Sequence, residues 1–96
     1  MVVSMLQLII EIPESFSIKD KRRIVKSIKD KLIQKFHLSC AETDLQESMR
    51  FAQLGAALVS NSADYGEAVL KKALDVVEKN LSLRVHDSGI HSEYFE

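Results

Sequence analysis

The chain of 96 residues contains one cysteine, one proline, three glycines and no tryptophan. A single cysteine excludes an intramolecular disulfide, and it gives no sign of the oxidising compartments in which disulfide-rich domains occur. So few prolines and glycines leave no segment that reads as a flexible linker or a low-complexity tract. The hydrophobic fraction of 46% is well above that of disordered chains. Residues 1–96 are therefore expected to form one globular domain.

Long hydrophobic runs are also missing. The apolar start, VVSMLQLII, is too short to cross a bilayer, and it carries neither a basic leader nor a small-residue cleavage site. We therefore expect a cytoplasmic protein with no membrane partner.

Hydrophobic periodicity divides the chain into strands and helices. Residues 2–12 alternate at period two, as a strand does, and Pro13 ends this strand because proline cannot donate to a ladder. Ser17 and Ser62 are suitable N-caps for two helices, each with its apolar residues on one stripe. The expected elements are strands over 2–12, 38–44 and 50–60, helices over 18–36 and 62–80, and a last strand from Leu81. The tail 88–96 is compatible with an extension of that strand or with a loop.

The resulting order, βαββαβ, is that of ferredoxin-like α+β domains. We expect a four-stranded antiparallel sheet with both helices on one face. Right-handed crossovers would place the first and third strands in its centre. Lys21 falls inside the apolar stripe of the first helix. We expect it either to extend past the sheet edge, with its ammonium group in water, or to pair with a carboxylate.

The sheet face away from the helices is also rich in apolar residues, as if the first strand were covered on both sides. An exposed apolar patch is a liability for a monomer, and a second copy of the chain pressed against it is the simplest resolution. Single exposed apolar residues are nevertheless ordinary, so a monomer remains the alternative. The candidate interface residues are Val3, Met5, Ile9, Ala57 and Val59.

The net charge of −1 hides an uneven distribution. Residues 18–36 hold eight of the thirteen basic residues and two acids, for a local balance of +6. Several cations crowd into the first turns of the helix, where the dipole disfavours each exposed one by about 0.3–1 kcal/mol. In the second helix, by contrast, the charges alternate and form the i,i+4 pairs Glu67–Lys71 and Asp75–Lys79. The candidate polyanion-binding residues are Lys19, Arg22, Arg23, Lys26 and Lys29.

These cations have two interpretations. A row of them can follow phosphates by point-charge attraction, independent of base sequence. They can also be the solvated side of an ordinary helix, neutralised across the fold or across a dimer. The acids considered for that role are Glu14, Glu42, Asp44 and Glu47. Base stacking on the sheet is excluded, because the first strand has no aromatic residue and the third has only Phe51.

Catalytic and metal sites find little support in the residues. His37 and Cys40 lie three apart on an extended segment and point to opposite faces, and the histidines of residues 86–91 lack zinc-site spacing. Cys40 is expected to face the core, where cysteines are usually inert. The acidic cluster at residues 42–47 is expected to be solvated. We therefore expect no catalytic residues, no metal and no cofactor.

The stretch Ser17-Ile18-Lys19-Asp20-Lys21-Arg22 resembles the Ser-Leu-Lys-Glu-Lys-Arg stretch of the YlxP-like proteins, a small bacterial family with a domain of unknown function. Similar residues follow in order and spacing at Ala41-Glu42, Gln46-Glu47, Ala52, Leu54-Gly55, Ala57, Val59-Ser60 and Glu93-Tyr94-Phe95. The resemblance implies a ferredoxin-like fold, a cytoplasmic location and an association with RNA or ribosomes, and it supplies no catalytic residues. Leu45 and Met49 stand where the family is expected to carry an aromatic pair, so any stacking contact by that pair is absent here.

The expected function is accordingly that of a non-catalytic binding module, whose basic first helix contacts RNA or a ribosomal particle. The alternative is a homo-oligomeric interaction protein, a dimer in the simplest case, whose basic helix meets acidic protein surfaces.

Overall fold

The computed structural model describes residues 1–12, 17–81 and 83–96, with the side chain of Asn80 excepted. Pro13 and Glu14 lie outside the described residues. The elements are β1 (Val2–Glu11), α1 (Ile18–Phe36), β2 (Ser39–Asp44), β3 (Phe51–Ser60), α2 (Ala63–Asp75), a π-helical turn η1 (Val76–Asn80) and β4 (Arg84–Tyr94). The predicted ferredoxin-like order is confirmed.

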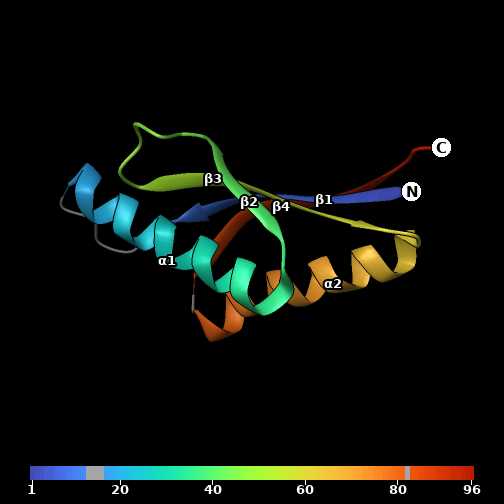
Figure 1. Cartoon of the computed structure of the whole chain (residues 1–96). Coiled ribbons are helices and arrows are strands. Elements are labelled where there is room, and N and C mark those ends of the chain that lie inside the picture. The colour runs from blue at the N-terminus through green and yellow to red at the C-terminus, as the bar shows by residue number, and fades with distance from the viewer. Residues whose placement is uncertain (13–16, 82) are drawn as a thin grey trace.

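The strands form one antiparallel sheet in the order β2-β3-β1-β4, so β1 and β3 are central, as predicted. β1 pairs with β3 along its whole length, from Val2 opposite Ser60 to Glu11 opposite Phe51. On its other side it pairs with β4, with a bulge where the register shifts between Ile9 and Ile10. Both helices cover the same face of this sheet, and the other face is left open (Figure 1). β1 is therefore covered on one side within the chain, and not on both.

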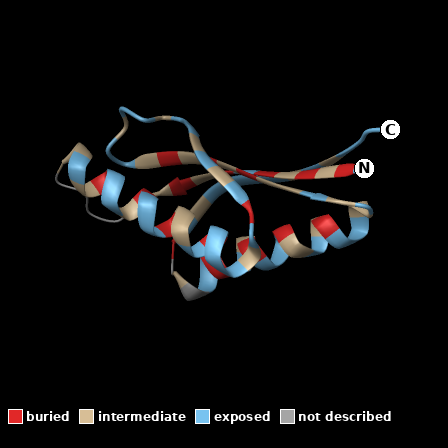
Figure 2. Ribbon diagram, in the orientation of Figure 1, coloured by how far each residue is buried: buried red, intermediate tan, exposed pale blue. Residues whose placement is uncertain are grey.

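Helix α1 begins and ends where its capping residues predict. The backbone N–H of Asp20 donates to Ser17 Oγ at 3.1 Å, which satisfies one of the free amides of the first turn. At the other end His37 has a left-handed backbone (φ 56°) and its N–H bonds to Ile33 O. In both helices the buried residues lie on the side toward the sheet and the exposed residues on the side away from it (Figure 2).

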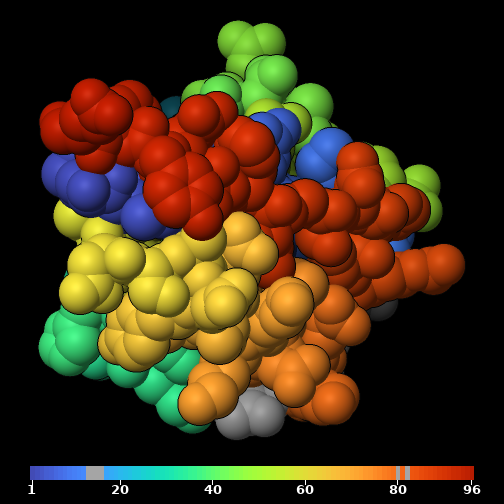
Figure 3. Space-filling view, turned by 90° about the vertical axis from the view of Figure 1, so that its right-hand side faces the viewer, coloured from blue at the N-terminus to red at the C-terminus, as the bar shows by residue number. Residues whose placement is uncertain are grey.

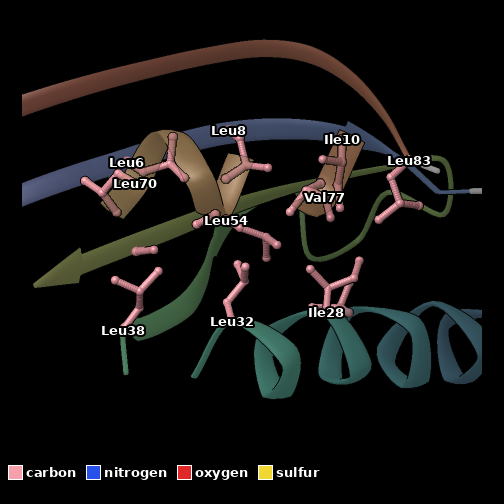
Figure 4. Close-up of a cluster of buried hydrophobic side chains, with 14 of the residues drawn as sticks. Leu6, Leu8, Ile10, Ile28, Leu32, Leu38, Leu54, Leu70, Val77 and Leu83 are labelled. Atoms are coloured by element: carbon pink, nitrogen blue, oxygen red, sulfur yellow. The ribbon is translucent and has the colours of Figure 1, made fainter. Parts of the chain in front are cut away.

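The core fills the space between the sheet and the helices (Figure 4). β1 contributes alternate residues, because successive side chains of a strand point to opposite faces. Leu6, Leu8 and Ile10 of β1 are each at most 1% exposed. Each such side chain stabilises the fold by about 1.5–3 kcal/mol. Their main partners from the other elements are Val25, Ile28, Leu32, Leu54, Leu70 and Val77.

The C-terminal segment differs from the prediction at its start. β4 begins at Arg84 and not at Leu81, because the amides of Leu81 and Leu83 bond to Val76 O and Val77 O and close the end of the helix. The tail extends the strand to Tyr94, which decides between the two expected alternatives. Beyond it, Met1 and Phe95 exchange backbone hydrogen bonds of 2.9 and 2.8 Å. The two ends of the chain consequently lie side by side (Figure 3).

Ser4 is the one polar residue of β1 on the core face, and it is fully buried. Its Oγ lies 2.8 Å from Ser92 Oγ, and Ser92 Oγ donates to Glu67 Oε2 at 2.6 Å. Glu67 thus bonds to β4, and the predicted ion pair with Lys71 does not occur among the described residues. Asp75 and Lys79 do form the other predicted pair, at 3.6 Å. Ser92 of β4 thus satisfies the buried hydroxyl. On the helix side, α2 approaches Ser4 closely at Gly66.

We predict that Gly66→Ala destabilises the protein by about 2 kcal/mol, because the added Cβ would lie 2.2 Å from Ser4 Oγ and 2.8 Å from Ser4 Cβ. The overlap outweighs the gain in helix propensity of roughly 1 kcal/mol. Urea denaturation measures the change. Lys72→Ala, at an exposed position of the same helix, is the control. Equal stability of the two variants would contradict the close approach.

Candidate functional site

The outer side of α1 carries most of the basic residues that the sequence singles out. Lys19, Arg22, Arg23 and Lys26 are all exposed. Lys29, the fifth candidate, is half-buried, because it lies on the side of the helix that faces β2. The four exposed cations are therefore the ones that can reach a partner directly.

Two of these four cations already have acidic neighbours on the same helix. Arg23 Nη2 donates to Asp20 Oδ1 at 2.6 Å, and Lys26 Nζ donates to Asp30 Oδ2 at 2.8 Å. The hydrogen bond and the negative charge of Asp30 raise the pKa of Lys26, so its ammonium group stays charged at neutral pH. Both pairs are exposed, and exposed pairs contribute little to stability because water screens them. Such pairs can exchange their carboxylates for another anion at little cost.

Lys19 and Arg22 have no ion pair among the described residues. The same is true of Lys31, an exposed cation that the sequence analysis did not select. Lys31 lines a shallow hollow of about 400 Å³ on the outer side of α1. The other lining residues are Arg23, Lys26, Ser27, Asp30 and Gln34. Helical spacing relates Arg23, Ser27 and Lys31 at intervals of four, so a wider sector of the helical wheel would have included Lys31.

Lys29 and Cys40 are neighbours between α1 and the edge strand β2. Burial raises the pKa of the Cys40 thiol, and the positive charge of Lys29 offsets part of that rise. A half-buried thiol with a raised pKa is a poor nucleophile. The expectation that Cys40 faces the core side of the sheet agrees with its half-buried position.

Lys21 does not extend into water. Its side chain is 1% exposed, and its Nζ lies 3.1 Å from Oε2 of Glu42, whose own side chain is 17% exposed. The Nζ also donates to the carbonyl oxygen of Leu45, a residue with positive φ (62°). The second expected alternative, pairing with a carboxylate, is therefore the one observed. The contact ties the start of α1 to the connection between β2 and β3.

The remaining acids proposed to neutralise α1 lie elsewhere. Asp44 accepts a hydrogen bond from the amide of Leu45 at 2.7 Å, and Glu47 is exposed. Neither forms an ion pair with α1 within the described part of the chain. Glu42 neutralises only Lys21, which lies inside the fold and not on its surface. The outer side of α1 therefore keeps most of its positive charge.

We predict that Lys21→Met destabilises the protein by about 3 kcal/mol, because it leaves the carboxylate of Glu42 partly buried without its counter-charge. Lys21→Met combined with Glu42→Leu should recover part of this loss. Denaturant unfolding of the two single variants and the double variant gives the coupling energy. Lys31→Met, at an exposed position of the same helix, should change stability by less than about 0.5 kcal/mol. Additive losses at positions 21 and 42 would contradict a coupled pair.

The open face of the sheet displays the five candidate interface residues together. Val3, Met5 and Ile9 alternate along β1, and Ala57 and Val59 lie beside them on β3, with Ala57 opposite Met5 and Val59 opposite Val3. Val59 is 65% exposed. Met5 and Ala57 also line a depression of about 680 Å³, which small residues such as Gly55 and Gly89 line as well. The predicted grouping of these residues on one face is thus what the register produces.

One end of the open face carries a cluster that the sequence analysis missed. Glu11 Oε1 accepts a hydrogen bond from Arg50 Nε at 3.1 Å. The centroid of the Phe51 ring lies 5.3 Å from the guanidinium carbon of Arg50 and 4.9 Å from the centroid of the His86 ring. Glu11, Phe51 and His86 come from three strands and Arg50 directly precedes β3, so no single local pattern connects the four residues. Only the sheet register brings them together.

No group of three or more histidine, cysteine, aspartate or glutamate side chains could hold a metal ion within residues 1–12, 17–81 and 83–96. Among the same residues, every helix is too short or too polar to cross a membrane.

A βαββαβ domain with an open sheet and a basic helix defines a class of small α+β proteins and not a single activity. The chain belongs to the DUF503 family, described as a protein of unknown function, which matches residues 3–90. Comparison with curated proteins gives no match.

Two solved structures are similar to the chain in fold. One is from Deinococcus radiodurans and is named for the antibiotic biosynthesis monooxygenases, with 15% identity, a TM-score of 0.45, and coverage of 100% of this chain and 93% of that one. The other is a Dabb family protein with a ferredoxin-like fold from Mesorhizobium loti, with 9% identity, a TM-score of 0.45, and coverage of 99% and 97%. Identities this low do not carry an activity from one chain to another.

Proposed function

We propose that this protein is a non-catalytic binding module that holds structured RNA, or an RNA-containing particle such as the ribosome, against the outer side of α1. The observation that carries the proposal is the set of exposed cations Lys19, Arg22 and Lys31, which have no ion pair among the described residues. Phosphate oxygens are the partners that such a row of point charges fits.

These cations project from a helix that packs rigidly against the rest of the domain. Val25, Ile28 and Leu32 bury the inner stripe of α1, and Lys21 anchors its first turns. Lysine and arginine side chains on a rigid helix lose less freedom on binding than the same side chains on a mobile loop, which favours affinity. A-form RNA is recognised mainly through its backbone and shape, so it needs no aromatic stacking platform. This agrees with the absence of aromatic residues from β1.

The position of the cations within α1 also supports a binding role. Lys19, Arg22 and Arg23 lie in the first turns, where the helix dipole opposes positive charge. Asp20 is the one acid in the first turn that offsets them. An arrangement that lowers helix stability is more readily explained by an external anion than by folding. The resemblance to the YlxP-like proteins, with their implied association with RNA, points the same way, as does the cytoplasmic location it implies.

A second candidate function is binding to an acidic protein surface. The observation that favours it is Ile33, which is 42% exposed on the outer side of α1 among the cations. An apolar side chain adds affinity for a protein surface and little for a phosphate backbone.

We predict that structured RNA binds the wild-type protein with an affinity that falls steeply as salt rises. Reversing three charges in the variant Arg22→Glu, Arg23→Glu, Lys26→Glu should reduce the slope of log Kobs against log salt by about two to three. Fluorescence anisotropy with a labelled RNA hairpin across a salt series measures both quantities. A lost phosphate contact lowers affinity for all sequences alike, so hairpins of different sequence should respond equally.

The matched control is Lys71→Glu, Lys72→Glu, Lys79→Glu, which changes the net charge equally but on α2 and the following turn η1. It should leave most of the binding intact. Equal loss in both triple variants would mean that net charge alone attracts the RNA. Negligible binding of the wild-type protein at low salt would refute the proposal and leave the acidic protein surface as the candidate, for which Ile33→Asp provides the corresponding test.

A further inference from the structure

The residues of the open face are arranged so that the same face of a second chain can pack against it. We propose that two chains pack their open faces together around a two-fold axis that runs between the sheets, perpendicular to the strands. Each chain's helices then lie on the outside of a four-layered dimer. This proposal does not depend on the binding of RNA.

The face is apolar along its two central strands. Val3, Met5 and Ile9 of β1 lie beside Val59, Ala57 and Gln53 of β3 in that order. All three β1 residues are half-buried by the sheet alone, and nothing in the described chain lies over them. Gln7 lies between Met5 and Ile9 on the same face and is exposed, so one polar side chain interrupts the apolar residues of β1. An apolar surface of this extent is uncommon on a monomer and typical of an interface.

Charged residues on the open face are concentrated on the edge strand β4 and at one end of β1. The register with β1 places Arg84 beside Glu11, Asp87 beside Ile9, Gly89 beside Gln7, His91 beside Met5 and Glu93 beside Val3. β4 therefore has a cation at one end, an acid at the other, and glycine at the midpoint. Arg84 and Asp87 form no ion pair among the described residues.

The charges along β4 are complementary to those of a second β4 that runs in the opposite direction. A two-fold axis perpendicular to the strands lays β4 of one chain across β4 of the other in the opposite direction. Arg84 then faces the Glu93 of the second copy, Asp87 faces its His91, and the two Gly89 residues meet at the axis. An axis parallel to the strands would instead place β4 over β2, where Ser39 and Ala41 carry no charge and Asp44, opposite Gln53 in the register, would meet the like charge of Asp87. The charges therefore select the perpendicular axis.

The size of the face is sufficient for a stable contact. Strands of ten residues are about 33 Å long, the six-residue β2 is about 20 Å long, and neighbouring strands are about 4.8 Å apart, so the face has a projected area of roughly 570 Å². Its accessible area is larger, since side chains corrugate it. A standard interface needs about 800 Å² from each partner. Packed sheets interdigitate their side chains, and the depression of about 680 Å³ around Gly55 and Gly89 leaves room for those of the second copy.

The first experiment tests whether this face holds two chains together. The wild-type mass by sedimentation equilibrium should be that of a dimer, and Met5→Glu with Ile9→Lys should give a monomer. Val59→Lys should shift the equilibrium in the same direction, and because Val59 is 65% exposed it should not affect folding. Lys72→Glu, exposed on α2, should leave the dimer unchanged. Far-UV circular dichroism checks that each variant is folded.

The second experiment tests the orientation. Arg84→Glu should weaken the dimer by about five- to tenfold, since two symmetry-related pairs turn repulsive at once. Adding Glu93→Arg should restore it, because the swapped charges again meet across the axis. Positions 84 and 93 are nine residues apart on one strand, about 30 Å, so the rescue cannot occur within a chain.

Each experimental outcome tests either the interface face or the direction of the two-fold axis. A wild-type protein that stays monomeric at the highest attainable concentration overturns the proposal and leaves the face for a different partner or a small apolar ligand. A dimer that survives all three apolar-face substitutions also overturns it. A dimer that these substitutions dissociate, but that the charge swap fails to restore, overturns the perpendicular axis. Dissociation followed by rescue supports both the face and the axis, whatever the result of the RNA titration.

Discussion

The placement of both helices on one face of the sheet is the constraint on which the rest of this structure depends. Two right-handed β-α-β crossovers leave no other arrangement for a chain in which β1 and β3 are central. Every second residue of β1 must then fill the core, and Leu6, Leu8 and Ile10 do so. The residues between them must face outward. The same backbone geometry that completes the core thus creates an apolar surface on the opposite side of the sheet.

A second constraint is the burial of Lys21. A charged group this far from water is stable only with a counter-charge and a hydrogen-bond acceptor, which Glu42 and Leu45 supply from β2 and the connection that follows it. The contact joins the first turns of α1 to the edge of the sheet. Arg22 and Lys31 therefore project from a helix that Lys21 fixes at its start and that its buried apolar residues fix along its length.

The two candidate surfaces lie on opposite sides of the molecule and do not compete. A second copy on the open face would leave α1 of both chains on the outside, and an anion on α1 would leave the open face free (Figure 1). Each dimer would then present two basic helices pointing away from each other. Two linked sites bind a long polyanion more tightly than either alone when it can reach both, so the two proposals would reinforce each other.

Hydrophobic period and capping residues determined the element order, the helix α1 and the composition of the core, because these depend on neighbours along the chain. The identity of the five open-face residues also followed from alternation and crossover handedness. Three features depended on tertiary structure. Leu81 and Leu83 alternate as a strand would, but close the end of a helix; Lys21 finds its carboxylate on another element; and the Glu11, Arg50, Phe51 and His86 cluster joins three strands. The bonds of Leu81 and Leu83 reach back only to Val76 and Val77, and the alternation of the two leucines does not distinguish this helix end from a strand. For Lys21 and for the cluster the deciding partner is distant in sequence, and only the register and packing of the sheet bring it near.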